Sequence, residues 1–411
     1  MQPASLNFVV REPGESVRLR LHLLTPMLGG GPEQGKPDPE QPFRAKSIRG
    51  QLRWWYRRVI QVTDAKELWE REAALFGSAG RDADDATPGK VRIAVDQGPP
   101  GARKPVNTLE QHRYAWGLFA KEAATNEVVL SHSAVVMVSG LDPDALAALA
   151  AWLYFGGIGA RTRRGFGSLR WVEEAGCLPS YEETVRRLAK GCGLRIAGGS
   201  GVTVLRHGPL AVASEAGWSK AAMDAWKDAL AWYEAFRKGN LQPGLSRAPE
   251  GPDSHSRWPE ANSVRLRQRQ RQTREAEVQE AVFPRASLGL PMAVRSAPRS
   301  VHSFKSVELE VNESGRWPST VITKAVFRGD AVEPTIAVLR GGGPKPDEVV
   351  SRGSRSFHAD SLSAKGFPTE WFDGHKFRTI PEIEGSTAPD KLISYLKYAK
   401  RQNAKAWEEV K

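Results

Sequence analysis

Residues 157–167 read GIGARTRRGFG, with two Gly-X-Gly pairs on either side of five residues that include three arginines. An alanine-rich stretch with helical character, residues 142–155, precedes this segment, and a strand-like stretch, residues 168–172, follows it. Glycine permits a positive φ and a close approach to the main chain, and arginine supplies permanent charge. A helix-loop-strand segment of this composition predicts a site for a polyanion, such as nucleic acid. A dinucleotide-binding fingerprint is disfavoured, because its glycines follow a strand and open a helix.

The segments before this loop have the order strand, helix, strand, strand and helix. Apolar residues alternate over residues 17–23, which indicates a half-buried strand. A helix follows, capped by Ser47 and running to about Val62, with its apolar face formed by Ile48, Leu52, Trp55 and Val59. Two strands, residues 90–95 and 128–138, the helix before the glycine loop and the strand after it complete the order βαββαβ. This order predicts an α+β, ferredoxin-like (RRM-like) first domain over residues 1–175, an arrangement shared with many RNA-binding modules.

The second half of the chain repeats this pattern less clearly. A connector, residues 176–200, contains a short helix at residues 180–190. Residues 201–411 then form a second, degenerate and elaborated ferredoxin-like domain. Its expected elements are a strand at 202–205, an amphipathic helix at 218–237, strands at 306–311, 320–327 and 336–339, and a basic C-terminal helix at 392–410.

A second basic segment lies at the start of the first helix. Residues 42–58 read PFRAKSIRGQLRWWYRR, with six basic residues and no acidic one. Lys46, Ser47 and Arg49 lie in the first turn, where free N–H groups and the helix dipole favour an anion, and Gly50 lets a ligand come close. A capped helix with a solvated basic face is the alternative interpretation. The βαββαβ topology brings the start of this helix and the glycine loop toward one cleft, which favours binding.

The overall charge agrees with an acidic partner. The 411 residues carry a formal net charge of +12, which indicates nucleic acid or an anionic surface as the partner. A membrane is the weaker choice, since no apolar run approaches the roughly 18 residues needed to span one. Cys177 and Cys192 lack metal-ligand spacing, so a reduced, cytoplasmic protein without a metal or other cofactor is expected.

The histidines and carboxylates give little support to an enzyme. The eight histidines are scattered, with no H-x-x-x-H or H-E-x-x-H spacing. His22 and His132 lie in strands, where a packed or surface histidine is the more frequent outcome. The sequence therefore supports binding better than cleavage, with no catalytic residue assigned.

Two further segments with arginine belong to the second half, one arginine-dense and one largely apolar. Residues 257–274 hold six arginines and one glutamate, and either a solvated loop or an RNA-contacting segment that orders on binding fits them. Residues 283–292 read FPRASLGLPM, which predicts a segment that packs on the core with Arg285 projecting outward.

Taken together, these motifs resemble the RAMP superfamily of CRISPR RNA-binding proteins, whose hallmark is a glycine-rich loop after the second helix of a ferredoxin-like fold. The closer resemblance is to the first-numbered (Cmr one) subunit family of the type III-B Cmr effector complex. The matching pieces occur in the family's order: Thr25-Pro26 with Gly29-Gly30, residues 46–50 followed by 52–55, residues 75–78, the loop at 157–168, and residues 283–292.

The resemblance implies two tandem ferredoxin-like RAMP domains in a non-catalytic, RNA-binding subunit of an antiviral ribonucleoprotein. Such a subunit accommodates the 3′ part of the guide crRNA, with target RNA and other RAMP subunits as further partners and no membrane contact. It implies the following RNA-facing residues: Lys46, Ser47, Arg49, Arg53, Gly157, Gly159, Arg161, Arg163, Arg164, Gly165, Gly167 and, in the second domain, Arg285. Trp54 and Phe166 are candidate stacking platforms.

Two other functions remain open at this point. The first is a metal-independent crRNA-processing endoribonuclease of the same superfamily, using His22 or His132. The second is a protein-interaction module whose positive charge serves docking.

Overall fold

A computed structural model of the protein describes fifteen stretches of the chain. They are residues 16–79, 86–116, 124–174, 176–191, 201–212, 217–238, 243, 284–290, 292–294, 307–311, 315–340, 349–352, 357–358, 388–399 and 407–411. The arginine-dense segment 257–274 lies outside the described residues. None of the helices in the described stretches has the length and apolar character that crossing a membrane requires.

The first unit has an antiparallel sheet with helices on one face. Strands β1 (Val17–Leu23), β3 (Arg92–Gln97), β6 (Ser133–Ser139) and β7 (Leu169–Glu173) pair in the order β3-β6-β1-β7. Helix α1 (Ala45–Val59) connects β1 toward β3, and α4 (Pro143–Phe155) connects β6 to β7. The α+β class and the βαββαβ order expected for this half are therefore present.

Three details of the first unit differ from expectation. The residue before α1 is Arg44, in extended conformation, so Ser47 lies inside the first turn and the prediction that it caps the helix is wrong. Helix α2 (Ala65–Phe76) is an addition that we did not predict, and the Asp64 side chain caps it by accepting from the Glu67 amide. The strand expected at 128–138 is two strands, because β5 (Glu127–Val129) pairs with β2 (Met27–Leu28) and β4 (Arg103–Pro105) in a separate small sheet.

The second unit repeats the same order of elements. Its sheet is β12-β13-β8-β16, made of β8 (Val202–His207), β12 (Val321–Arg328), β13 (Ala331–Leu339) and β16 (Trp407–Glu409). Helices α6 (Gly217–Lys238) and α9 (Ala388–Ala399) are its two connections. The basic helix expected to run to residue 410 ends at Ala399, and residues 407–409 instead pair with β8.

The remaining elements are short. The connector helix is α5 (Tyr181–Lys190), close to the range expected from sequence. Strand β9 (Leu210–Ala211) pairs with β13, and a further sheet contains β10 (Met292–Val294), β11 (Val307–Val311), β14 (Val349–Arg352) and β15 (Phe357–His358). Short helical segments include α3 (Arg113–Trp116), η3 (Glu110–His112), η5 (Thr162–Arg164) and η6 (Pro284–Leu288).

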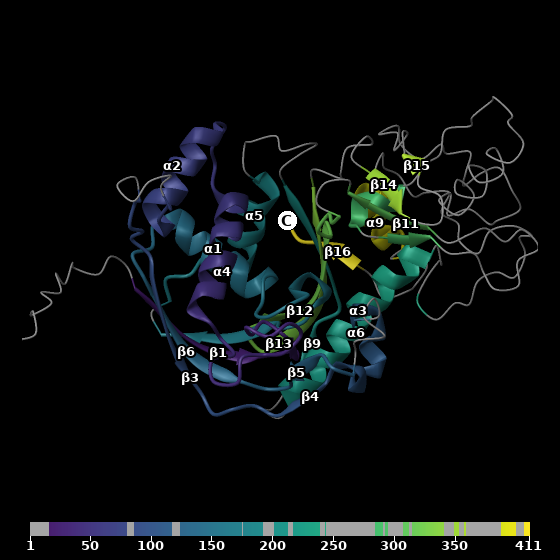
Figure 1. Ribbon diagram of the computed structural model, residues 1–411, viewed down its shortest axis with the longest axis horizontal. Coiled ribbons are helices and arrows are strands. Elements are labelled where there is room, and N and C mark those ends of the chain that lie inside the picture. Colours follow the sequence, from purple (N-terminus) through teal and green to yellow (C-terminus); the bar gives the residue numbers. More distant parts are fainter. Residues whose placement is uncertain are drawn as a thin grey trace, which may run out of the picture.

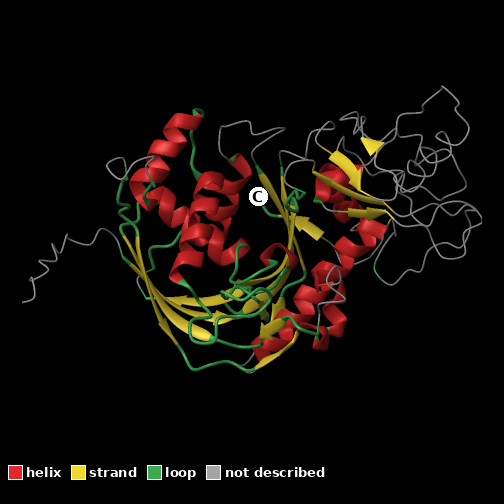
Figure 2. Ribbon diagram, in the orientation of Figure 1, coloured by secondary structure: helices red, strands yellow, loops and turns green. Residues whose placement is uncertain are grey.

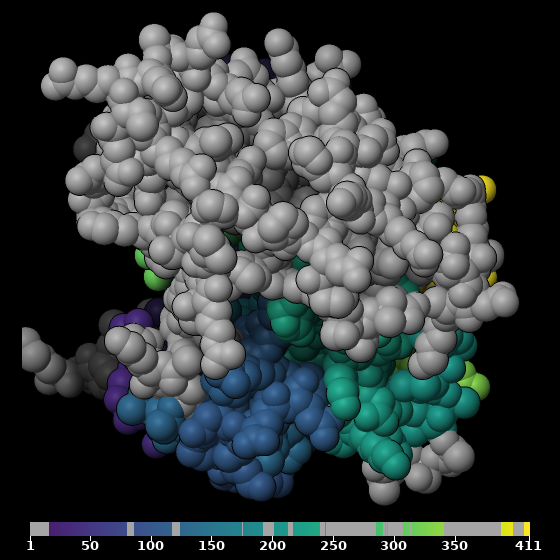
Figure 3. Space-filling view, turned by 90° about the vertical axis from the view of Figure 1, so that its right-hand side faces the viewer, coloured from purple at the N-terminus to yellow at the C-terminus, as the bar shows by residue number. Residues whose placement is uncertain are grey.

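The two units share their cores in a layered arrangement. One apolar cluster contains residues of the first sheet, of α1, α4 and α5, and also Ile322, Val326, Ala337 and Leu339 of the second sheet. Helices α1, α4 and α5 therefore lie between the two sheets, and α6 and α9 cover the far face of the second (Figure 1, Figure 2). On another face α6 packs directly against the segment of the first unit that contains η3 and α3 (Figure 3). The two halves consequently form one packed body.

Candidate nucleic-acid interface

Helix α1 presents three different surfaces. Its apolar stripe, Ile48, Leu52, Trp55 and Val59, is buried, as the periodicity predicts. Arg49 on a second side donates to the carbonyl oxygens of Phe76, at 3.2 Å, and of Val91, at 3.0 Å. Burial lowers the pKa of this guanidinium. Arg49 therefore joins α1 to the end of α2 and the start of β3.

Arg53 and Arg57 on the same side bind a buried carboxylate of α2. Arg53 Nε donates to Glu72 Oε1 at 2.6 Å, and Arg57 donates through Nη2 to Oε1 at 2.7 Å and through Nε to Oε2. Burial alone would raise the pKa of Glu72, but hydrogen bonds from the two arginines outweigh it and lower the pKa. Arg49 and Arg53, two of the expected RNA contacts, are thus engaged within the first unit.

The glycine loop is closed onto protein backbone. Ile158 N donates to Gly167 O at 3.0 Å, Ala160 N to Leu28 O at 2.7 Å, and Gly167 N to Pro26 O at 2.8 Å. Gly159, Gly165 and Gly167 have positive φ, and a Cβ on Gly167 would lie 1.9 Å from Ile158 O. A Cβ on Gly157 would lie 2.7 Å from Gly167 O. The glycines permit close packing of the loop on itself and on residues 26–28.

The three loop arginines contact protein groups as well. Arg161, the one non-glycine residue with positive φ among the described residues, donates to Ala115 O at 3.2 Å. Arg163 Nη1 donates to Ser319 O at 2.5 Å, and the Arg164 guanidinium lies over the rings of Tyr114 and Tyr233. Burial lowers the pKa of Arg161 and of Arg163 to about 10. The loop therefore joins the first unit to the second.

Gly165 is the closest point of that junction. Trp226 Nε1 of α6 donates to Arg164 O at 2.6 Å, and a Cβ on Gly165 would lie 2.1 Å from the same nitrogen. Phe166 is fully buried, with its ring edge-on to Trp226 at 4.9 Å. Phe166 therefore cannot stack on a base, and that expectation is wrong.

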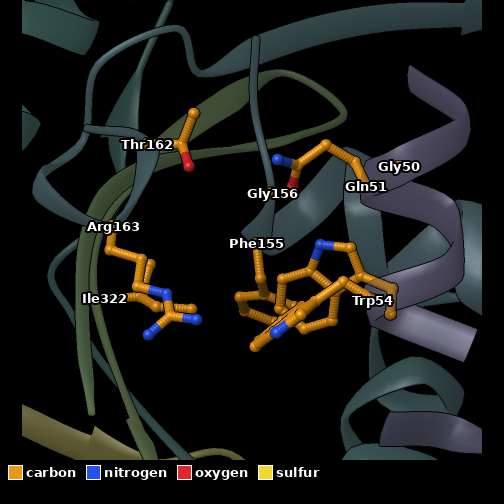
Figure 4. Close-up of a pocket in the computed structure, with 9 residues that line it drawn as sticks. Gly50, Gln51, Trp54, Phe155, Gly156, Thr162, Arg163 and Ile322 are labelled. Atoms are coloured by element: carbon orange, nitrogen blue, oxygen red, sulfur yellow. The ribbon is translucent and has the colours of Figure 1, made fainter. Parts of the chain in front are cut away.

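The third surface of α1 faces the glycine loop across a cavity of about 230 Å³. Gln51 and Trp54 line it from α1, and Thr162 and Arg163 line it from the opposite side (Figure 4). Gly50, Trp55, Phe155, Gly156 and Ile322 complete the wall. The middle of α1 and the glycine loop therefore meet, and Ile322 of β12 in the second unit closes the space between them. The first turn of α1, which we expected to face the loop, contributes no residue to this wall.

The cavity combines flat aromatic surface with charge and donors. Arg58 and Arg163 each lie 5.0 Å from the centre of the Trp54 ring. The indole Nε1 of Trp55 is buried without a hydrogen-bond partner in the described structure. Gly50 leaves space beside them, since a Cβ there would have no neighbour within 4 Å. Such a wall suits a planar, polar ligand with an associated negative charge.

A buried lysine lies at the base of this region and was not predicted. Lys324 of β12 is 1% exposed and donates to the carbonyl oxygen of Gly156, a residue that lines the cavity. Burial lowers its pKa to about 7. No sequence signal identifies Lys324, because it lies in a largely apolar strand whose partner helix comes from the other half of the chain.

Lys46, Ser47 and Arg285 lie outside the cavity wall. Lys46 and Ser47 are exposed in the first turn of α1. Arg285 Nη1 donates to Arg237 O, near the end of α6, at 2.9 Å. The motif around Arg285 does approach the glycine loop, because Thr320 donates to Ser287 O and the adjacent Ser319 accepts from Arg163.

The two histidines considered for catalysis lie away from the cavity. His132 is buried, with its ring nitrogens 3.2 Å from Pro99 O and 3.0 Å from Gln97 Oε1, and burial lowers its pKa. His22 lies on the outer side of β1, opposite Ser133 of β6. Neither contributes to the wall around Trp54 and Arg163.

Several solved structures resemble this chain at low identity. Cmr1 from Pyrococcus furiosus, in its apo form, is 15% identical with a TM-score of 0.45, covering 84% of this chain and 92% of that chain. A chain of type III-B Cmr-beta bound to cognate target RNA is 10% identical with a TM-score of 0.37, covering 94% and 99%. A chain of a type IV-B CRISPR complex is 12% identical with a TM-score of 0.25, covering 40% and 93%.

Comparison of the sequence with protein families matches part of the chain. No curated protein matches the chain. The RAMP superfamily model matches residues 20–170, which run from β1 through the glycine loop into β7. The match to the RAMP superfamily therefore covers the sheet, the helices and the glycine loop of the first unit.

Proposed function

We propose that this protein is a non-catalytic, RNA-binding subunit of a type III-B (Cmr) CRISPR effector complex. In this proposal it binds near the 3′ end of the guide crRNA, or the guide–target duplex, and assembles with other RAMP subunits in the cytoplasm without a cofactor. The observation that carries the proposal is the cavity in which α1 and the glycine loop meet. The RAMP match over residues 20–170 and the net charge of +12 support it.

The cavity would receive one unstacked nucleotide of the RNA. Trp54 offers a ring face for a base, and Trp55 Nε1 is an unpaired donor for a carbonyl oxygen of a base. Arg163 would attract the attached phosphate across the cavity. Lys46 and Ser47, which are exposed in the first turn of α1, would bind the RNA backbone next to this nucleotide.

The remaining expected contacts take supporting roles in this proposal. Arg49 and Arg53 hold α1 against α2, and the loop glycines let the loop fold tightly behind the cavity. Arg164 holds the two units together, because its carbonyl oxygen accepts from Trp226 of α6. Arg161 and Arg285 each bind a carbonyl oxygen of their own unit, so all three would position the RNA site through the fold.

A substitution at Gly50 tests the proposal without disturbing the core. Gly50→Phe places a ring into open space beside Trp54, because nothing lies within 4 Å of a Cβ at this position. We expect binding of a labelled single-stranded RNA, measured by fluorescence anisotropy at fixed salt, to weaken about tenfold, the value of one stacked base. The thermal midpoint should not fall.

The matched control is Gly50→Ala, which leaves the cavity open. It should bind RNA like the wild type and be more stable by about 1 kcal/mol, because alanine favours a helix. Wild-type affinity in the Gly50→Phe variant would exclude the cavity as the RNA site.

Lys46→Ala should reduce by about 0.7 the slope of log affinity against log salt concentration, as expected for one lost phosphate contact on a single strand.

The endoribonuclease alternative has less support. A general base must reach the scissile ribose, and the residues that line the cavity include no histidine, carboxylate or lysine. Incubation of the protein with repeat RNA in EDTA separates the two functions. Specific cleavage that disappears in His22→Ala would favour the enzyme.

A further inference from the structure

The outer face of the first sheet is exposed, although the equivalent face of the second sheet is covered. The outer face, defined here as the outward side chains of β3, β6, β1 and β7, turns away from α1 and α4 (Figure 1). Trp218 of α6 touches Arg170 at its border, and none of the other described helices packs on it. Antiparallel sheets often leave one face to solvent, so exposure alone decides nothing.

The composition of this face differs from that of an ordinary solvated sheet. Met137 of β6 is 50% exposed and Val172 of β7 is 53% exposed, and they are two of the three large apolar side chains exposed among the described residues. Both flank the central strand, because Met137 pairs with Arg18 and Val172 pairs with Arg20. Apolar side chains thus alternate with arginines across the middle of the sheet.

The second sheet shows how such a face is covered in this fold. Its side turned away from α6 and α9 carries Ile322, Val326 and Arg328, and it packs on α4 and α5 of the first unit. Glu182 of α5 accepts from Arg328 at 2.8 Å, and the Arg328 guanidinium lies 4.7 Å from the Tyr181 ring centre. A helical layer with apolar side chains and a carboxylate is therefore the partner of this surface type.

We infer that the outer face of the first sheet docks a helical layer of a neighbouring protein subunit that carries apolar side chains and carboxylates. On the proposed function, that neighbour is another subunit of the same effector complex. Apolar residues of its helix would cover Met137 and Val172, and its carboxylates would pair with Arg20 as Glu182 pairs with Arg328. Arg18, which lies 3.6 Å from the exposed Glu174 carboxylate, would add a second positive charge to the same surface. The neighbour would thereby add one more helix layer to the alternating sheets and helices of this fold.

Two alternative occupants fit less well. RNA lacks a stacking platform here, because the outward residues of the four strands include no Phe, Tyr or Trp. A second copy of this chain would offer α6, whose exposed face is predominantly positive. Its exposed charged residues include the carboxylate Asp224 and three lysines, Lys220, Lys227 and Lys238. Like charges would then face the arginines, which disfavours self-stacking.

The test uses the full chain, co-expressed with the other RAMP subunits of its effector complex and guide RNA. In the double variant Arg18→Glu, Arg20→Glu, we expect incorporation into the purified complex to fall at least about tenfold, because the charge of the face is reversed. Binding of the isolated variant to single-stranded RNA should stay within about twofold of wild type. Lys220→Glu with Lys227→Glu is the matched charge reversal on α6, and it should incorporate like wild type.

A second measurement on the wild-type chain needs no substitution. Hydroxyl-radical oxidation followed by mass spectrometry should modify Met137 in the isolated chain and leave it unmodified in the assembled complex. Equal oxidation of Met137 in both states, or wild-type incorporation of the double variant, would overturn the docking surface.

Other outcomes separate this inference from the proposed function. Loss of RNA binding in the isolated double variant, with incorporation retained, would make this face an RNA surface and overturn the docking role. A wild-type chain that binds RNA and recruits no subunit would overturn the docking role alone. A chain that does neither would overturn both.

Discussion

The two sheets of this protein have the same strand order and different surroundings. The second sheet, β12-β13-β8-β16, is covered on one face by its own α6 and α9 and on the other by α4 and α5 of the first unit. The first sheet, β3-β6-β1-β7, is covered by helices on its inner face. One helix layer thus packs against both sheets, so the second unit depends on the first for part of its core. Changes at the shared boundary should therefore affect stability far more than changes on the outer face of the first sheet.

The largest effect is expected where the glycine loop meets α6. Gly165→Ala adds a Cβ 2.1 Å from Trp226 Nε1 at a φ of +89°, so both overpacking and backbone strain oppose it. We expect a loss of about 3 kcal/mol in the free energy of unfolding, measured by urea titration. Gly176→Ala is the control, since Gly176 also has a positive φ but no neighbour within 4 Å. It should cost about 1 kcal/mol, and equal losses would show that the boundary is not tightly packed.

Much of the fold could be predicted from the sequence because each unit has a strong local pattern. The apolar stripe of α1, the alternation in β1 and the long helix α6 are all visible in residue spacing. Helix α2 was missed because its buried carboxylate, Glu72, hides the apolar pattern. The strand at residues 407–409 was missed because its pairing partner, β8, lies about half the chain away in sequence.

The candidate site was predicted in part. The sequence predicted that α1 and the glycine loop lie close together, and the structure does place Trp54 beside Arg163. The group that each arginine side chain contacts could not be predicted, because these groups belong to residues that are distant in sequence. Arg53 reaches Glu72 of α2, and Arg163 reaches Ser319 of the second unit. Lys324, Phe155 and Ile322 were missed because nothing marks them before the two halves are packed.

The next effect is a pH dependence at the same boundary. The pKa of Lys324 falls from its ordinary 10.5 to about 7 because the side chain is buried between the units. Between about pH 7 and pH 10, Lys324 is therefore protonated in the unfolded chain and neutral in the folded chain. Stability should therefore rise with pH over this window, by up to about 1.4 kcal/mol per pH unit, and show no such slope below pH 7.

Urea unfolding at pH 7 and pH 9 measures this slope. Lys324→Met should remove the group's contribution, so the gain in stability on raising the pH should be smaller by about 2 kcal/mol in the variant. An identical gain in both proteins would mean that Lys324 remains charged, and that the boundary is less dry than its burial indicates.

The smallest effect compares arginines of the two sheets directly. Arg328→Ala on the covered face should cost about 2 kcal/mol, because it removes the hydrogen bond to Glu182 and leaves buried Glu333 with one fewer partner. Arg20→Ala on the outer face should change the unfolding free energy by less than about 0.5 kcal/mol. Similar losses at both positions in thermal unfolding would contradict the difference between the two faces.

Cross-linking to RNA tests directly whether the cavity between α1 and the glycine loop receives RNA. The wild-type chain, bound to single-stranded RNA, is irradiated with ultraviolet light, digested and mapped by mass spectrometry. We predict nucleotide adducts on the peptide that contains Trp54 and Trp55, with their yield sharply reduced in Gly50→Phe. Adducts confined to peptides that do not line the cavity, with yields unaffected by Gly50→Phe, would contradict the account.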